Sequence, residues 1–275
     1  MIRKVFIGLL LGAIIVTAIL YLKQPTKTIT IGEYEAMPQI DIALDVLNID
    51  IASSPDDKIH VQMQGHNVKK DMLTITEENN KFSITEQQRE NKWYEIINLR
   101  STPVIIIQLP KSQSKSLTLH NADGSSIIQN LILDTMQLET AAGFMNLNNV
   151  ATSNAKLHSN DGTVTITKSA IDNLSITTRA GDVAIKESIG SVHTIQTTDG
   201  KIMITEAIEQ PNVSMKSNSG DISIHYKKTP TSLQVMPSGE NSIITLPNFD
   251  KKTFKIGEGA YNLSAETNYG SIIIE

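Results

Sequence analysis

The sequence contains no cysteine. This absence excludes a disulfide framework, a thiol nucleophile and a cysteine-ligated metal site. Aromatic residues are also scarce, at 4% of the chain with a single tryptophan, whereas 40% of the residues are hydrophobic. Aliphatic side chains must therefore build the core.

The chain has no excess of basic residues, because 24 lysines and arginines stand against 29 acidic residues, for a net charge of −5 at pH 7. This balance argues against nucleic acid and against electrostatic docking on an anionic polymer. The sequence also contains no Gly-x-Ser-x-Gly elbow, no His-Glu-x-x-His pair and no phosphate-binding loop. We therefore predict a non-enzymatic protein with no catalytic residues, no metal ligands and no cofactor.

Glycine recurs through the second half of the chain. Hydrophobic and polar residues alternate on both sides of each glycine, as at Leu174 and Ile176 before Gly181 and at Val183 and Ile185 after it. This alternation indicates two short half-buried strands per unit, joined by a corner that needs positive φ or close backbone approach. The glycines are Gly124, Gly143, Gly162, Gly181 and Gly200, each 19 residues after the last, then Gly220 after 20 and Gly239 after another 19.

A fixed period of this length favours a solenoid over a β-meander, whose turns vary more. We predict an all-β fold, a parallel β-solenoid or β-helix of about 19-residue coils, in which each unit stacks on the one before it. Equivalent residues then form columns about 4.8 Å apart. The regular repeats cover residues 113–275, with His193 as a polar member of an inward column. Residues 228–262 break the pattern and read as an irregular coil or an insertion.

Residues 39–112 carry alternating strands at less regular spacing and read as opening β coils with an insertion at residues 86–102. The insertion contains Trp93 and Tyr94, which are the only adjacent aromatic residues. Such a pair is either a ligand platform or a cap folded over the side of a coil. Our hypothesis for a ligand-facing surface is a flat ladder of Thr, Ser, Asn and Asp, joined by Trp93 and Tyr94.

The N-terminus carries an apolar run from Val5 to Leu22, preceded by Arg3 and Lys4. Eighteen helical residues span about 27 Å, close to the ~30 Å hydrocarbon core of a membrane. The run is too long for a typical signal peptide, and no small-x-small cleavage site follows it. We predict an uncleaved single-pass transmembrane signal anchor at residues 1–22 and a linker at 23–38. The N-terminus is then cytoplasmic and the C-terminal domain extracellular.

Two clusters could hold a metal ion. Asp123, Asp161 and Asp199 occupy corners of every second coil, so they lie about 9.6 Å apart, too far to share a calcium ion. His120, Glu139 and His158 share one outward position in successive coils. The same spacing separates the two histidines, which favours a solvated ladder over a zinc site.

Two elements resemble a known family. One is the strand-ending element Val104-Ile-Ile-Ile-Gln-Leu-Pro110, and the other is the repeat unit from Leu174 to Ile185. Both are similar to the bacterial putative-adhesin family of β-solenoid domains, over residues 40–275. With its N-terminal anchor the chain is most similar to LiaG-like members from Gram-positive envelope stress operons. The resemblance implies the solenoid fold and no established catalytic residues.

We therefore expect a membrane-anchored extracytoplasmic β-solenoid that serves as an adhesin-like binding or scaffold module of the bacterial cell envelope and is linked to an envelope stress response. Its expected partners are the membrane, through residues 1–22, and a cell-wall polymer or a membrane protein of a stress system. The alternative is a carbohydrate-active enzyme on a β-helix, acting on cell-wall or extracellular polysaccharide. That activity requires clustered acids on one face. A third reading is a sensor that signals through the membrane segment.

Overall fold

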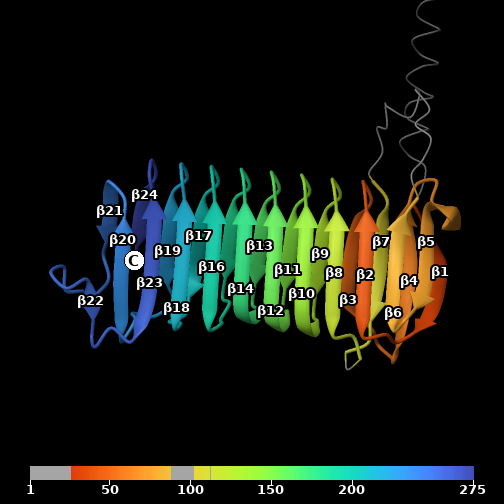
Figure 1. Cartoon of the computed structure of the whole chain (residues 1–275), viewed down its shortest axis with the longest axis horizontal. Helices are drawn as coiled ribbons and strands as arrows, with labels where there is room; N and C mark the ends of the chain where they lie inside the picture. Colours follow the sequence, from red (N-terminus) through yellow and green to blue (C-terminus); the bar gives the residue numbers. More distant parts are fainter. Residues whose placement is uncertain (1–25, 88–101, 112) are drawn as a thin grey trace, which may run out of the picture.

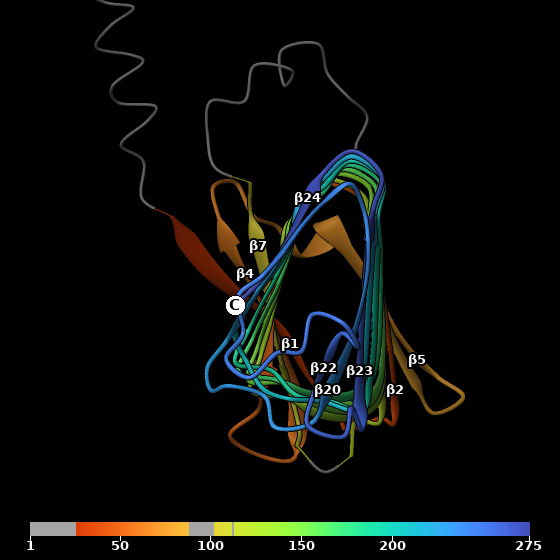
Figure 2. The ribbon, with the colours of Figure 1, turned by 90° about the vertical axis from the view of Figure 1, so that its left-hand side faces the viewer.

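The computed structural model describes residues 26–87, 102–111 and 113–275. They form two twelve-stranded sheets that run along one elongated stack (Figure 1). Seen along the stack, the coils superimpose, and each coil contributes one strand to each of the two sheets (Figure 2). The prediction of an all-β, mainly parallel solenoid is confirmed. The predicted transmembrane helix and the residues Trp93 and Tyr94 lie outside the described residues. Among the described residues, no helix has the length and apolar character needed to cross a membrane.

We call the two sheets A and B. In spatial order, sheet A contains β1 (Lys27–Glu35), β4 (Lys58–Gly65), β7 (Val104–Leu109), β3 (Asn48–Ser53), β9 (Ser126–Gln129), β11 (Met145–Asn148), β13 (Val164–Thr167), β15 (Val183–Lys186), β17 (Ile202–Ala207), β19 (Ile222–Tyr226), β24 (Ser271–Ile274) and β21 (Asn241–Ile244). Sheet B contains β22 (Lys255–Ile256), β20 (Leu233–Ser238), β23 (Tyr261–Thr267), β18 (Asn212–Ser217), β16 (Val192–Thr197), β14 (Ala170–Thr178), β12 (Ala151–Ser159), β10 (Ile132–Thr140), β8 (Ser116–Asn121), β2 (Gln39–Leu44), β6 (Lys81–Glu86) and β5 (Leu73–Glu78). A 3-10 turn, η1 (Lys70–Met72), precedes β5.

The 19-residue period becomes the strand register. Met136 pairs with Ala155, and Ala155 pairs in turn with Leu174, so equivalent side chains form columns along the stack. The inward columns are aliphatic and buried, as at Val164 and Val183, which are 0% and 1% exposed. Each coil therefore buries its apolar side chains against its neighbours rather than within itself.

The glycine corner joins sheet B to sheet A at the top of Figure 2. None of the glycines in the repeats has positive φ there. Close approach is the reason for glycine, because a Cβ on Gly162 would lie 1.8 Å from the carbonyl oxygen of Gly143. The column runs from Gly124 through Gly220 and ends at Gly270, whose Cβ would lie 2.2 Å from the oxygen of Gly220. Gly239 keeps the period in sequence but is not in this column.

A column of buried polar side chains supports the glycine corner from within. Three residues before most of these glycines, a hydroxyl or amide oxygen accepts a hydrogen bond from the glycine N–H, at 2.9 Å for Ser159 to Gly162 and 2.8 Å for Ser217 to Gly220. At Gly181 the hydroxyl of Thr178 instead donates to the glycine carbonyl oxygen, at 2.7 Å. Ser217 and Thr267 also donate to the carbonyl oxygen of the glycine one coil away, at 3.1 Å and 3.0 Å. These bonds satisfy backbone groups that would otherwise be buried without partners.

The opposite corner uses left-handed backbone without glycine. One residue per coil has φ between 50° and 56° there, namely Asn130, Asn149, Lys168, Glu187 and Glu206. Asparagine tolerates this conformation better than other non-glycine residues. The positive-φ requirement that the sequence analysis linked to the glycines therefore falls on the other corner.

The order of the coils is not sequential at the C-terminal end. Strand β18 pairs with β23, and β23 pairs with β20, so the coil of residues 261–275 lies between two coils that precede it in the chain. Side chains 50 residues apart confirm this neighbourhood, with Lys216 Nζ 2.7 Å from Glu266 Oε1. The expectation that each unit stacks on the one before it is wrong here. Residues 228–262 contain β20 and β21, which form the terminal coil.

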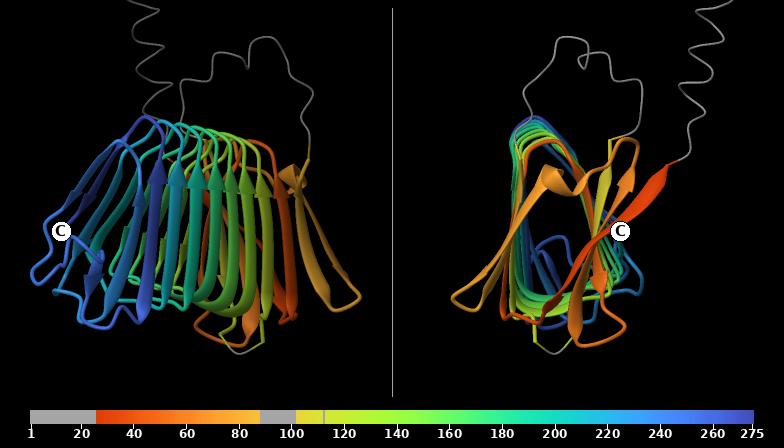
Figure 3. Two further views of the ribbon diagram at one scale, coloured as in Figure 1. Left: turned by 60° about the vertical axis from the view of Figure 1, so that its left-hand side comes forward. Right: turned by 90° about the vertical axis from the view of Figure 1, so that its right-hand side faces the viewer.

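The strand order at the N-terminal end of the stack also departs from the order in the chain. Strands β2 and β3 pair directly with β8 and β9, while β6 and β7 come later in the chain and pack on their outer side. Antiparallel strands β1 and β4 then extend sheet A, and β5 extends sheet B. The β5–β6 hairpin projects beyond the stack, in orange in Figure 3. These antiparallel strands cover sheet edges that parallel coils would leave open.

Two predicted boundaries are therefore wrong. Residues 27–35 of the predicted linker form β1, because Thr28, Ile29, Thr30 and Ile31 alternate as a strand requires. Glu86, placed at the start of the predicted insertion, is the last residue of β6. Its Oε2 accepts hydrogen bonds from three successive N–H groups, those of residues 45–47, at 2.8 to 3.2 Å. This carboxylate links β6 to the turn between β2 and β3.

His193 is buried inside the solenoid at 1% exposure, in the column of Met136, Ala155 and Leu174. Its Nε2 lies 3.1 Å from the carbonyl oxygen of Ile171, and its Nδ1 has no hydrogen-bond partner among the described residues. Burial lowers the pKa of His193, and the bond to Ile171 opposes this only in part. The neutral imidazole is therefore the form that the folded chain holds.

We expect His193→Leu to weaken the pH dependence of stability. The unfolded chain takes up a proton on His193 below about pH 6.5, whereas the folded chain resists it. The wild-type free energy of unfolding therefore falls as the pH drops below that value, by up to about 1.4 kcal/mol per pH unit more than in the variant. Urea denaturation at pH 7.5, 6.5 and 5.5 measures the difference. Parallel pH profiles for the two proteins would contradict this role of His193.

Candidate binding face on sheet B

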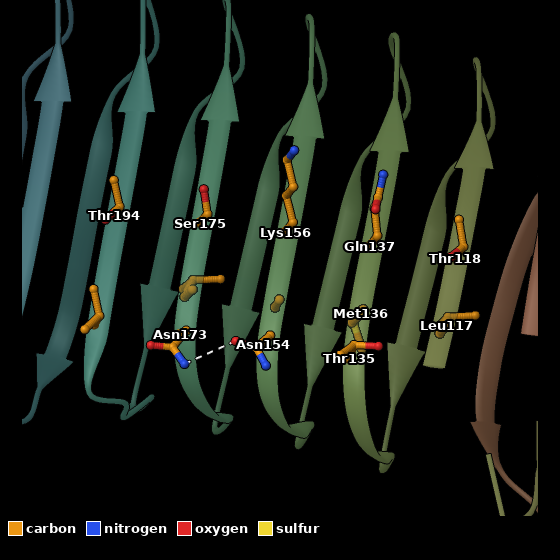
Figure 4. A pocket seen from close by; sticks show the side chains of 13 residues that line it. Leu117, Thr118, Thr135, Met136, Gln137, Asn154, Lys156, Asn173, Ser175 and Thr194 are labelled. Atoms are coloured by element: carbon orange, nitrogen blue, oxygen red, sulfur yellow. Dashed lines mark hydrogen bonds between the residues drawn. The ribbon is translucent and has the colours of Figure 1, made fainter. Parts of the chain in front are cut away.

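The outer face of sheet B carries polar side chains in rows that cross the strands. Paired residues of β8, β10, β12, β14 and β16 form each row, so a row has one member per coil. Figure 4 shows the first two rows except Ser116. Row 1 is Ser116, Thr135, Asn154, Asn173 and Val192; row 2 is Thr118, Gln137, Lys156, Ser175 and Thr194; row 3 is His120, Glu139, His158, Thr177 and Gln196.

Two hollows lie on the part of this face that strands β8 to β16 form. The larger, of about 520 Å³, is lined by residues of rows 1 and 2 over the five strands from β8 to β16. The smaller, of about 250 Å³, includes Glu139, His158 and Thr177. Gln137 and Lys156 line both hollows, so the two hollows lie side by side. We call the combined feature the sheet B groove.

A bend in three strands shapes the lower edge of the groove. In β10, β12 and β14 two successive residues both point outward, as Asp134 and Thr135 do, which interrupts the alternation. The pairing between β10 and β12 skips Asp134. Thr152 Oγ1 donates to the carbonyl oxygen of Asp134 at 3.1 Å and fixes the bend from inside. Row 1 follows this bend, where the strands curve in Figure 4.

Most polar groups of the groove are free for a ligand. Asn173 Nδ2 donates to Asn154 Oδ1 at 3.2 Å, which links two members of row 1 (Figure 4). Within residues 26–87, 102–111 and 113–275, the side chains of Thr118, Gln137, Lys156, Ser175 and Thr194 form no hydrogen bond or ion pair with the protein. Row 2 therefore presents hydroxyl, amide and ammonium groups to solvent.

The predicted ladder of His120, Glu139 and His158 lies on this face in row 3, with the three residues in register. His120 Nδ1 is 3.6 Å from Glu139 Oε2, and both side chains are about half exposed. Among the described residues no group of three or more His, Asp or Glu side chains is arranged to hold a metal ion. The ladder is a solvated row in the described structure.

The acidic residues beside the glycines bond to neighbouring corners. Asp161 pairs with Arg179 of the next coil at 2.5 Å, and Asp182 Oδ1 accepts a hydrogen bond from the N–H of Lys201 at 2.8 Å. At Asp221, hydrogen bonds from the backbone N–H and the hydroxyl of Ser271 lower the pKa of the carboxyl group. These acids stabilise turns between coils.

The sequence prediction of a flat polar ladder needs two changes. The face is hollowed rather than flat, and the described residues that line the groove include glutamine and lysine but no aspartate. The period-2 pattern identifies Thr118, Gln137 and Lys156 as outward residues of one row. The groove depends on the bend at Asp134, which the analysis of the repeat did not include. Trp93 and Tyr94, the proposed ligand platform, lie outside the described residues.

Comparison with known proteins identifies relatives of the whole repeat region. The Toastrack DUF4097 family matches residues 37–275. A solved structure of a putative adhesin from Parabacteroides merdae is similar with a TM-score of 0.56 at 12% identity, over 91% of this chain and 95% of that one. A putative lipid binding protein from Parabacteroides distasonis gives 0.53 at 14% identity, over 92% and 98%. No curated protein matches in sequence. The fold and the extent of the match show that the chain belongs to the Toastrack DUF4097 family, in keeping with its resemblance to the putative adhesins.

Proposed function

We propose that this protein is a non-enzymatic binding or scaffold module of the bacterial cell envelope, and that its ligand lies in the sheet B groove. One observation carries the proposal. The groove crosses five consecutive coils and is lined by polar side chains that the described protein does not use internally. A rigid stack holds these groups at fixed spacing without any loop movement, which reduces the ordering cost of binding an extended ligand.

The groove supports binding better than the alternative of a polysaccharide-cleaving enzyme. Glycoside hydrolysis uses two carboxyl groups about 5 to 9.5 Å apart. Among the described residues that line the two hollows, Glu139 is the single carboxylate. A general acid without a second carboxylate at this distance does not complete that chemistry. We therefore propose that the protein binds its ligand without cleaving it.

The proposal also includes a location. Residues 1–22 act as an uncleaved signal anchor with a cytoplasmic N-terminus, and the solenoid lies outside the membrane. We include in this proposal a LiaG-like role in an envelope stress response, with a membrane protein of that system as the other partner. The apolar run from Val5 to Leu22 after Arg3 and Lys4 supports this part of the proposal.

Intact mass measurement of the protein isolated from membranes tests the anchor. We expect the mature chain to retain residues 1–22 and to remain with the membrane after alkaline washing. A new N-terminus near residue 23 would show instead that the segment is a cleaved signal peptide.

Co-purification of the full-length protein from native membranes tests the binding role. We expect an envelope polymer or a membrane protein to remain with the wild type and to be lost with Thr194→Trp, which fills the groove. The matched control is Ala184→Trp on the outer face of sheet A. Shortening of a retained polysaccharide during incubation would favour the enzyme.

A further inference from the structure

We propose that the ligand of the sheet B groove is a neutral linear polysaccharide that lies along the axis of the solenoid. This inference rests on the proposed binding function and adds the chemical class and the direction of the ligand. Four features of the groove carry it: its direction, its hydrogen-bonding groups, its exposed apolar side chain and its charge.

The direction follows from the lining residues. The larger hollow includes residues of β8, β10, β12, β14 and β16, which are successive neighbours in sheet B. A feature that crosses five strands extends along the stack for about four strand spacings, roughly 19 Å. A compact small molecule would contact only one or two coils. A linear polymer can contact all five.

The hydrogen-bonding groups are mostly neutral and two-sided. Hydroxyl and amide side chains both donate and accept hydrogen bonds. Rows 1 and 2 are built largely from them, as at Gln137, Asn154 and Ser175. A polymer rich in hydroxyl or amide groups offers both partners at every unit. An extended peptide repeats at about 3.3 Å per residue and falls out of step with strands spaced about 4.8 Å apart.

One apolar side chain of the groove is open to a ligand. Val192, at the end of row 1, lines the larger hollow and is 41% exposed. A sugar ring combines both characters, because its C–H faces are apolar and its edges carry hydroxyl groups. Such a ring can lie against Val192 while its edges bond to rows 1 and 2.

The charge of the groove argues against an anionic polymer. Among the described residues, Lys156 is the only charged one in the lining of the larger hollow. Glu139 lines the smaller hollow beside it. An anionic chain requires several cations in series to give strong binding. One lysine per five coils with a nearby carboxylate cannot supply them.

Retention of the full-length detergent-solubilised protein on insoluble polymers tests this inference. The probes are chitin and cellulose, which are neutral, and alginate gel and immobilised polyphosphate, which are anionic. We expect retention on at least one neutral polymer, changed less than about twofold between 50 mM and 500 mM salt because no ion pairs form. Neither anionic probe should retain the protein.

Three variants assign the binding to the groove. Ser175→Trp fills row 2 and should weaken retention by about tenfold or more, because it displaces the polymer from the centre of the groove. Thr165→Trp on the outer face of sheet A should change retention by less than about twofold, as expected for a site outside the interface. Lys156→Gln keeps hydrogen bonding and removes the charge, so retention on a neutral polymer should also stay within about twofold.

Each result has one meaning. Salt-sensitive retention on alginate or polyphosphate that Lys156→Gln removes would overturn the neutral ligand and leave the proposed binding function standing. Equal losses for Ser175→Trp and Thr165→Trp would overturn the groove as the site. Absence of retention on every probe, with a ligand still co-purifying from native membranes, would overturn the polysaccharide alone.

Discussion

Gly162→Ala is expected to destabilise the solenoid severely, although alanine is a small change. A Cβ at this position would lie 1.8 Å from the carbonyl oxygen of Gly143, which is backbone of the preceding coil and cannot rotate away. The two coils must separate locally, which strains the inter-coil hydrogen bonds on both sides. We expect a loss of about 3 kcal/mol or more in the free energy of unfolding. Chemical denaturation followed by circular dichroism measures it.

Gly239→Ala is the matched control for this prediction. Gly239 keeps the 19-residue period in sequence but stands outside the column, and its added Cβ would lie 2.9 Å from the nearest atom, the oxygen of Thr267. A small shift relieves this contact, so the expected loss is about 1 kcal/mol or less. Similar losses for the two variants would contradict the assignment of the column to Gly270 rather than Gly239.

A pair of introduced cysteines should show which coils are neighbours, because a disulfide forms only between adjacent strands. The natural chain has no cysteine that could form another disulfide. Ser214 and Ser264 pair across β18 and β23 and both point outward. Neighbouring strands lie about 4.8 Å apart, within the range for a disulfide between two Cα atoms. The Ser214→Cys, Ser264→Cys variant should therefore form an intramolecular disulfide on oxidation. Non-reducing mass spectrometry of a digest detects it.

The pair of Ser214→Cys with Met236→Cys is the control. Met236 pairs with Ser264, so two strand spacings, about 9.6 Å, separate it from Ser214. This exceeds the reach of a disulfide. Sequential stacking would place β20 directly beside β18 and reverse both results. A disulfide at 214–236 and none at 214–264 would therefore contradict the inserted coil.

The repeat could be predicted from the sequence because it depends on residues that are close together in the chain. Alternation on both sides of Gly181 determines which side chains point inward, and the period determines which residues pair. The order of the end coils has a different cause. Leu233 and Leu263 each satisfy the same inward pattern, and the choice between them depends on which coil packs better against β18. No property of the repeat itself decides that, and Gly239 misleads because its spacing is regular.

The candidate site was predictable in part for the same reason. The outward positions of Thr118, Gln137 and Lys156 follow from strand alternation, so their common row could be foreseen. The hollow depends on the strand bend near Asp134, where tertiary hydrogen bonds interrupt the alternation. The proposed role of Trp93 and Tyr94 stays a prediction. His193 was recognised as an exception in its column, and the structure adds its burial and its unpartnered Nδ1.

Photo-crosslinking in living cells tests most directly the central claim, which is that the protein contacts its ligand through the outer face of sheet B. A photoreactive residue would replace Thr194, at the end of row 2, or Ala184, at a partly exposed outward position on sheet A. The account predicts that irradiation of the full-length protein links envelope material to position 194 and leaves position 184 unmodified. Adducts from position 184 alone, from both positions equally, or from neither would contradict it.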